Sequence, residues 1–529
     1  MAASSCVGLI TLDVFAQQIP EGIHHYELLV LTNPAQENSP ENAAFEVTDC
    51  GLVAGRHTEG GVTKGFVWLS RDLYGHPSHT MLNLSYPGFP GCEAYDLSDD
   101  GFVVGILGNS TSLLGGPMTR GAVWNLSAGL QPTAVPPPPG WPSSGSSFLQ
   151  AISTNPPHSV VGWAQSPSLC FGGTPRKIAM QFWPATNTYV AAEPAMAPTT
   201  AFGVSESSTL VVGNQTQCNG TGSTCTSESL SLLWRAEGTA LVSSDRSPPP
   251  SAQYSLETSE LRAVVDDGVG AGFMFDVFNI MLGCEQRAVA WRNLATTTDA
   301  VVLPPTFGAS SSLLADDLEK SWDGLGHFGV GIIADETSST HGVLWHHATT
   351  AEWNSLSWTW LDINAAISPL HGAEVLRLRG VNRYGDCVGT ALIGTQHGPV
   401  FLRAVRCVGD LDHSGVVGAE DLAILLNSWE CGLPCEASAD LNIDGAINAL
   451  DLSTLLNQWG GCLHQRPACA NVAVDVPEQY RIEAREKLDF SLQYVGLSDL
   501  LTYRTWTETV PAPLREIVDQ AIWRILKDE

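Results

Sequence analysis

The segment Val103-Val104-Gly105, followed by Gly121-Ala122-Val123-Trp124, contains the pattern around which most of this chain is organised. A short apolar run ends in glycine, and a second run ends in an aromatic residue. The pattern recurs roughly every 50 to 60 residues, and a steady period of this kind indicates a repeat architecture. Seven copies are present, with the glycines at Gly55, Gly105, Gly162, Gly213, Gly272, Gly331 and Gly389 and the aromatic residues at Trp68, Trp124, Trp183, Trp234, Trp291, Trp345 and Phe401.

Each copy has the signals of a four-stranded antiparallel unit. Its first strand enters a tight turn, as at Asp99-Asp100-Gly101 or Asp266-Asp267-Gly268, because glycine supplies the positive φ that such a turn requires. The glycine-ended and aromatic-ended runs are the second and third strands. A fourth strand is expected in six copies, at residues 80–84, 130–135, 188–192, 239–242, 299–303 and 357–363.

The two ends of the repeat region complement each other. The seventh copy lacks a fourth strand after Phe401, whereas residues 26–31 form an extra strand before the first copy. The N-terminal strand can therefore complete the last unit and close a ring, which removes free sheet edges. We expect a mainly β fold with a seven-bladed β-propeller over residues 22–405, and an open β-solenoid is the alternative. The repeated tryptophans are expected in the core, with a row of sugar-stacking rings as the alternative.

The repeat resembles the HAF family of bacterial extracellular repeats, in which a Val-Val-Gly strand precedes an Ala-Phe-Leu-Trp strand. Phe66-Val67-Trp68 and Ala122-Val123-Trp124 match this pattern, whereas the last copy ends in Phe401. The resemblance covers residues 22–405. It implies a propeller exposed on the cell surface and no defined reaction.

Composition limits the partners and the compartment. The net charge of -30 argues against binding to nucleic acid or to anionic lipid, because both require a basic surface. No apolar run is long enough for a transmembrane helix. The 13 cysteines include no C-x-x-C pair, which favours disulfides in an oxidising compartment over zinc binding. Residues 1–21 are interpreted as a remnant export signal or an N-terminal extension, and the protein as secreted or on a bacterial cell surface.

A tandem duplication after the repeats has the spacing of a calcium loop. Residues 410–421 and 440–451 both carry oxygen side chains at positions 1, 3, 5 and 12 and a glycine at position 6. A hard cation needs six to eight oxygen ligands, and alternate residues of a tight loop point inward. Ser414 stands where a carboxylate is commoner, which predicts a weaker first site. Leucines at spacings of three and four predict a helix after each loop.

A loop followed by one helix, duplicated in this way, resembles a type I dockerin over residues 406–469. The resemblance implies two Ca²⁺ ions and a cohesin-like protein or cell-surface scaffold as partner. Residues 419–420 and 449–450, where that family reads its partner, do not match each other. Calcium that only folds this small module is the alternative. The implied ligands are Asp410, Asp412, Ser414, Asp421, Asp440, Asn442, Asp444 and Asp451, the backbone carbonyls of Val416 and Ala446, and Asn448, directly or through water.

The remaining segment, residues 470–529, is expected to be a helical tail. Its last helix has an apolar stripe that would pack on the protein, and a sorting or docking tail is the alternative. No nucleophile elbow, phosphate loop or H-E-x-x-H motif occurs in the sequence. We therefore expect no catalytic residues and a non-enzymatic binding protein, with a glycan as a candidate ligand of the propeller face. The alternative is an O-glycosyl hydrolase acting on polysaccharide, and a purely structural surface protein is a third interpretation.

Overall fold

The computed structural model describes most of the repeat region and the module that follows it. Most of the N-terminal segment 1–21 and the whole expected helical tail 470–529 lie outside the described residues. The residues described are 19–20, 23–31, 36–69, 80–84, 86, 88–89, 91–108, 119–139, 145–169, 175–192, 198–219, 226–237, 240–247, 256–276, 285–296, 299–305, 311–334, 339–412, 414, 416–429 and 437–462.

The repeats form antiparallel units of four strands each. The first three units are β2 (Ala43–Val47), β3 (Val53–Glu59), β4 (Val62–Leu69) and β5 (Thr80–Asn83); β6 (Cys92–Leu97), β7 (Phe102–Leu107), β8 (Arg120–Asn125) and β9 (Gly129–Val135); and β10 (Ser146–Ile152), β11 (Val160–Leu169), β12 (Pro175–Trp183) and β13 (Thr188–Ala192). The next three are β14 (Thr199–Val204), β15 (Val211–Asn219), β16 (Thr226–Glu237) and β17 (Ala240–Asp245); β18 (Leu256–Val264), β19 (Gly270–Asp276), β20 (Glu285–Trp291) and β21 (Ala300–Val302); and β22 (Ser311–Lys320), β23 (Gly326–Ala334), β24 (Thr340–Ala348) and β25 (Trp358–Asp362). The fourth strands expected after the aromatic residues are thus found.

The last unit combines both ends of the repeat region. It contains β26 (Ala373–Val381), β27 (Cys387–Ile393) and β28 (Gln396–Val405), and its outer strand is β1 (His25–Val30). β1 runs antiparallel to β28 in continuous register, from His25 opposite Val405 to Val30 opposite Val400. The N-terminal strand therefore takes the place of the missing fourth strand. Elsewhere β13 and β17 pair in parallel over two residues, which joins two neighbouring units into one eight-stranded sheet.

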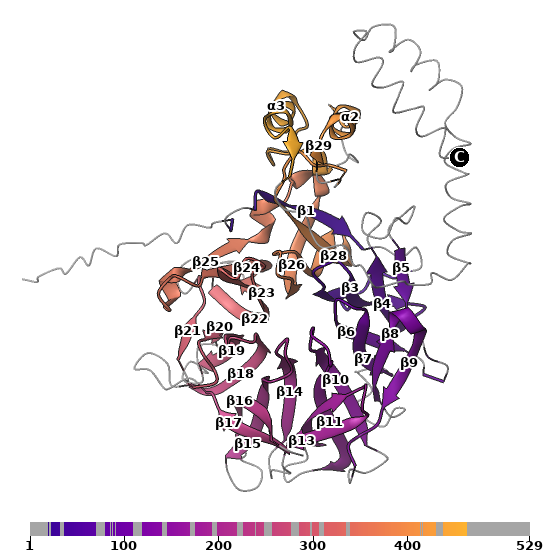
Figure 1. Ribbon diagram of the computed structural model, residues 1–529, viewed down its shortest axis with the longest axis vertical. Coiled ribbons are helices and arrows are strands. Elements are labelled where there is room, and N and C mark those ends of the chain that lie inside the picture. The colour runs from indigo at the N-terminus through magenta and orange to yellow at the C-terminus, as the bar shows by residue number, and fades with distance from the viewer. Residues whose placement is uncertain are drawn as a thin grey trace, which may run out of the picture.

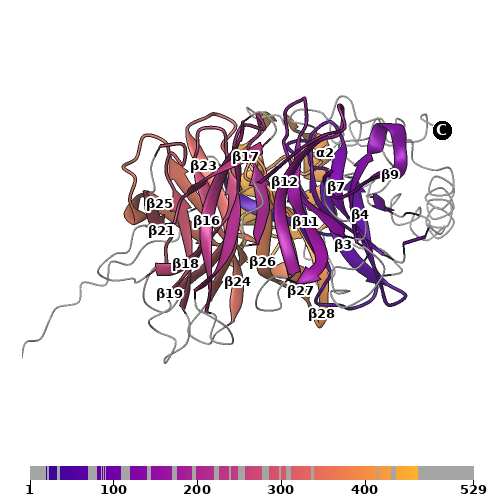
Figure 2. The ribbon, with the colours of Figure 1, turned by 90° about the horizontal axis from the view of Figure 1, so that it is seen from below.

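The units follow one another around a common centre, so the fold is mainly β and propeller-like (Figure 1). The strands run roughly along the viewing direction of Figure 1, as the view turned by 90° shows (Figure 2). The core lies between adjacent sheets. It contains Trp68, Trp124, Trp234, Trp291 and Trp345, all of them buried, whereas Trp183 is only partly buried against it. The expectation that the repeated tryptophans are core residues is confirmed for these five.

The repeated glycine is explained by a β-bulge in the first strand of each unit. The register of the first strand shifts opposite this glycine, as between Ala315 and Asp317 opposite Gly331. A β-carbon on Gly331 would lie 1.8 Å from the carbonyl oxygen of Leu314, far inside contact distance. A β-carbon on each of the other six repeat glycines would lie between 1.9 and 2.4 Å from a first-strand carbonyl oxygen. The bulge thus requires glycine at this position because the two backbones approach closely.

A small module follows β28 directly. It contains the helices α2 (Ala419–Asn427) and α3 (Ala449–Asn457), the 3-10 turn η7 (Ala437–Ala439), and the two-residue strands β29 (Val416–Val417) and β30 (Gly460–Gly461), which pair. The helices lie outside the ring, next to β1 (Figure 1). A disulfide between Cys407 and Cys462 joins the two ends of the module. Among the described residues, no helix is both long and apolar enough to span a membrane.

Candidate functional site

The first predicted calcium loop brings three carboxylates together. One side-chain oxygen each from Asp410, Asp412 and Asp421 lies within 4.8 Å of the other two. Asp421 reaches the loop from the first turn of α2, where it is fully buried. Burial, together with the charge of Asp412, raises the pKa of Asp421. Negative charge is therefore concentrated at one point of the loop.

Backbone donors hold the Asp421 carboxylate in place. Its Oδ1 accepts hydrogen bonds from the amides of Leu411 at 2.6 Å and Asp412 at 3.0 Å, and its Oδ2 accepts one from Gly418 at 2.7 Å. These bonds close the loop onto α2. They are local and depend on the spacing between the loop start and the twelfth position, which explains why the sequence pattern could identify Asp421.

The second loop repeats this arrangement. Asp451 is buried at the start of α3, and its Oδ1 accepts from the amides of Leu441 at 2.8 Å and Asn442 at 3.3 Å. Its Oδ2 accepts from the amide of Asn448 at 2.7 Å. Asp440 is also buried and accepts from the amides of Asp444 at 3.1 Å and Gly445 at 3.0 Å. The two loops therefore share the internal bonding that their sequences share.

Other predicted ligands bond to one another inside the loops. The Ser414 hydroxyl donates to the carbonyl of Val416 at 3.1 Å, and the Asn448 amide donates to the carbonyl of Ala446 at 3.1 Å. The Asn442 amide donates to the Asp444 carboxylate at 2.9 Å. The oxygens expected to bind a cation are thus close together in each loop and would have to exchange these bonds for metal contacts.

The two loops differ in how well they fit a hard cation. The first has three converging carboxylates, which is the donor set that calcium prefers. Among the described residues of the second loop, no three acidic side chains converge within the same distance. There Asp440 accepts a hydrogen bond at 2.5 Å from Ser368, which lies outside the module. The geometry favours the first loop, although the serine in it had predicted the weaker site.

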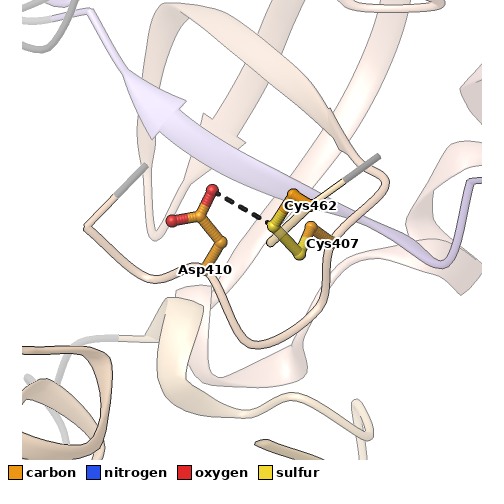
Figure 3. A group of neighbouring side chains, drawn as sticks. All are labelled: Cys407, Asp410 and Cys462. Atoms are coloured by element: carbon orange, nitrogen blue, oxygen red, sulfur yellow. Dashed lines mark hydrogen bonds between the residues drawn. A yellow bond between two sulfur atoms is a disulfide. The ribbon is translucent and has the colours of Figure 1, made fainter. Parts of the chain in front are cut away.

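A sulfur-containing group lies beside the first loop. Cys462 Sγ is 3.7 Å from Asp410 Oδ2, and Cys462 is bonded to Cys407 (Figure 3). Disulfide sulfurs are not thiolates, and the thiolate is the form of cysteine that binds metals. The disulfide therefore positions the start of the first loop and does not enlarge its set of ligands.

The module is packed against the last repeat unit. Its core includes the buried side chains of Val417, Leu425, Leu441 and Leu455, and Leu370 from the 3-10 turn η6 (Pro369–His371) packs against it. Ser368, immediately before this turn, makes the hydrogen bond to Asp440. The predicted first ligand of the second loop is thus part of the contact between the module and the ring.

A cavity of about 390 Å³ lies at the centre of the ring, within the size range of small-molecule sites. Residues of the first strand of every repeat unit line it, and the bulged positions face it. The bulged residues are Phe45, Tyr95, Gln150, Phe202, Arg262, Asp316 and Arg379. Seven different side chains therefore occupy equivalent places around one channel.

Carboxyl groups dominate the part of the channel beyond the bulges. Burial raises the pKa of Asp96 to about 7 and that of Asp317 to about 6. Burial and the neighbouring Asp317 raise the pKa of Glu46. Asp96 bridges to the next unit, because its Oδ2 accepts from the amide of Ile152 at 2.7 Å, and Asp317 does the same with the amide of Val381 at 3.0 Å. These carboxyls tie neighbouring units together through backbone amides.

The comparisons with known proteins leave the function of this chain open. No protein-family model and no curated protein sequence matches it. The tricorn protease is similar over 85% of this chain and 42% of its own, at 11% identity and a TM-score of 0.35. A chain of the mitotic checkpoint complex (76% of this chain, 100% of its own, 9% identity, TM-score 0.37) and an ulvan lyase of family PL25 (70%, 96%, 8%, 0.37) are also similar. This chain spans less than half of the tricorn protease chain, and these likenesses concern the fold alone.

Sequence reasoning did not identify the channel residues. Paired carboxylates over a central channel were conceivable, but the pattern did not show which ones would meet. The available signal was positional: Glu46, Asp96 and Asp317 each follow the bulged residue of their own repeat. Aligning the copies on the glycine of the second strand would have placed all three at one level.

Proposed function

We propose that this chain is a non-enzymatic binding protein of the cell surface or of the secreted fraction. Residues 22–405 form a seven-bladed propeller of the HAF type that presents a ligand-binding face, and residues 406–469 form a dockerin-like module. The module binds two Ca²⁺ ions and attaches the propeller to a cohesin-like protein or a surface scaffold. The pairing of β1 with β28 supports the closed ring over an open solenoid.

The observation that carries the calcium proposal is the convergence of Asp410, Asp412 and Asp421. Positions 1, 3 and 12 of a loop come together there, as a calcium loop requires. A bound ion would supply the positive charge that offsets these three carboxylates. In the second loop Asn442 and Asp444 would turn inward to join Asp440 and Asp451.

Calcium titration of the full chain tests this proposal. We expect heat of binding for two ions in the wild type and for one ion in Asp412→Asn, since that loop loses a carboxylate oxygen. Glu420→Gln is the matched control, because Glu420 is an exposed residue of the same loop and belongs to neither predicted ligand set. Absence of any calcium heat in the wild type would remove the basis for the module's proposed role.

Exposed apolar side chains support the docking part of the proposal. Half of the exposed large hydrophobic residues in the described chain belong to the module. They are Val416, Leu426, Leu450, Leu456 and Trp459. Exposed apolar groups that gather on so small a module are typical of a protein interface.

A pull-down tests the attachment. The full chain would be immobilised and exposed to surface and secreted fractions of the producing cell, with calcium or with chelator. We expect one defined protein to be captured only with calcium and lost in Leu450→Lys. Equal capture of this protein in the presence of chelator would contradict calcium-dependent docking.

An assay of polysaccharide cleavage distinguishes the hydrolase alternative from the binding protein. Asp96 and Asp317 have pKa values near neutrality, as a general acid requires, but both accept backbone hydrogen bonds between units. We therefore expect retention of polysaccharide without new reducing ends. Production of reducing ends that is lost in Asp317→Asn would favour the hydrolase.

A further inference from the structure

Five arginines line the central channel: Arg56, Arg262, Arg377, Arg379 and Arg383. Four of them are ion-paired. Arg56 pairs with Glu41 and Glu93, Arg262 with Glu260, and Arg383 with Asp49, and Arg377 binds Asp316 through two nitrogens. No salt bridge or hydrogen bond of Arg379 is found among the residues that the structure describes. Its Nε is shielded from solvent and has no hydrogen-bond partner there.

Charges of both signs and an aromatic ring surround Arg379. Its guanidinium stacks over the ring of Phe45 at 5.0 Å, and Arg56 lies over the same ring at 5.4 Å. Burial and the charges of Arg377 and Arg56 lower the pKa of Arg379 to about 10, against the opposing charges of Asp316 and Glu41. A guanidinium in this position is still charged at neutral pH. Asp316 and Glu41 act on this charge, but neither forms an ion pair with Arg379 among the described residues. A buried cation without a direct partner is costly.

The aromatic ring limits where the guanidinium can lie. Contact with the Phe45 ring restricts the position of the Arg379 guanidinium, and Tyr95 contacts Phe45 edge-on at 5.4 Å. A guanidinium on an aromatic ring can still donate its terminal N–H groups to a planar or tetrahedral oxyanion. Asp316 is bound by Arg377 through both of its oxygens, and no hydrogen bond from Arg379 to Asp316 is found among the described residues.

We propose that Arg379, in the lining of the central channel, binds the carboxylate or sulfate group of an acidic ligand. This inference rests on the proposed role of the propeller as the ligand-binding part and names the chemical class of the ligand. The oxyanion has two sources, a free small anion or an acidic sugar unit of a glycan, and both would bind the same guanidinium edge.

The test uses the full chain with calcium, inorganic sulfate, and two oligosaccharides of equal length, one built of uronic acids and one neutral. We expect sulfate to raise the melting temperature of the wild type. The acidic oligosaccharide should bind at least about tenfold more tightly than the neutral one, as expected for a charge-assisted contact. Arg379→Gln should lose the sulfate effect and weaken acidic binding by about tenfold, whereas Arg379→Lys should retain part of both.

Arg292→Gln is the matched control, because Arg292 is exposed and outside the channel lining. A melting temperature of Arg379→Gln at or above that of wild type shows that the variant folds. Sulfate binding alone identifies a free small anion, and acidic oligosaccharide binding identifies a glycan; either supports the site if it depends on Arg379. Equal binding by Arg379→Gln, or no anion effect in a folded wild type, would overturn the proposal. If the neutral oligosaccharide binds and its binding does not depend on Arg379, the propeller is a ligand-binding part, but Arg379 is not an oxyanion site.

Discussion

At the scale of single residues, the repeat glycine is visible in the sequence of one strand, whereas the reason for it lies in the neighbouring strand. The glycines at Gly105, Gly331 and equivalent places were visible as the end of an apolar run. Glycine is required at these positions because a β-carbon would lie less than 2.5 Å from a carbonyl oxygen of the neighbouring bulged strand. No pattern within one strand reveals this contact, because the bulge is a property of the pair of strands.

Gly331→Ala tests the close approach. We expect a loss of at least about 2 kcal/mol in the free energy of unfolding, since the added methyl group meets backbone that cannot move alone. Gly329→Ala in the same strand is the control. Its β-carbon would lie 3.6 Å from Leu318, so the change should be small or slightly stabilising. Similar losses in both variants, measured by urea unfolding, would refute the steric explanation.

Channel carboxyls give a second prediction at this scale. Burial and the carboxyl of Glu206 raise the pKa of Glu319 well above its ordinary value. A carboxyl with a raised folded-state pKa contributes stability at low pH that is lost as the pH rises above the unfolded value. The neighbouring channel carboxyls Asp96 and Asp317 have folded-state pKa values of about 7 and 6. Because the unfolded-state value is about 4, most of the stability that these two groups contribute is lost between roughly pH 4 and 7.

Glu319→Gln should therefore stabilise the protein at pH 8, by on the order of 1 kcal/mol, and have little effect at pH 4. The measurement is the melting temperature across this range at saturating calcium. Glu352→Gln, which removes the same charge from an exposed position, should show no such dependence. A difference that grows toward low pH would have the wrong sign for this account.

At the scale of elements, the closing strand was predictable because its evidence was local. The seventh copy lacked a fourth strand, and one apolar segment before the first copy belonged to no repeat. The structure pairs β1 with β28 over six residues and buries Tyr26 and Leu28. The packing of the module on Ser368 and Leu370 was not predictable, since nothing in either segment identifies the other.

Leu28→Ala tests the contribution of the closing strand. Leu28 is 3% exposed, and its loss should cost about 2 to 4 kcal/mol of unfolding free energy. Val30→Ala in the same strand is the control, because Val30 is 37% exposed and should cost about 1 kcal/mol or less. Equal and small effects in urea unfolding would mean that β1 adds little to the fold.

The disulfide of the module gives another prediction. Cys407 and Cys462 are separated by 55 residues, so their bond restricts a long loop of the unfolded chain. Replacing both with serine should destabilise the module by about 4 kcal/mol in the chain-entropy treatment. The measurement is the calcium concentration at which the module folds, which should rise in the double variant. An unchanged calcium dependence would show that the helices and loops suffice.

At the scale of the whole molecule, the ring brings together residues that are far apart in the chain. Asp96 meets the amide of Ile152, and the charge of Asp317 acts on Glu46. The repeat period predicted the architecture, because a period arises from the features that all units share. The channel depends on the positions where the units differ, and a single sequence does not show which differences face the centre.

The place of β28 in its sheet has a mechanical consequence. β28 is hydrogen-bonded to β1 on one side and β27 on the other, and Cys407 of the module lies two residues after it ends. A pull applied through an anchored module would enter the ring along β28. Its hydrogen bonds to both neighbours would then carry the load together in shear, without opening one after another. If the module is the attachment point, as proposed, β1 would share this load with β27, and closing the ring would also strengthen the connection between the ring and the module.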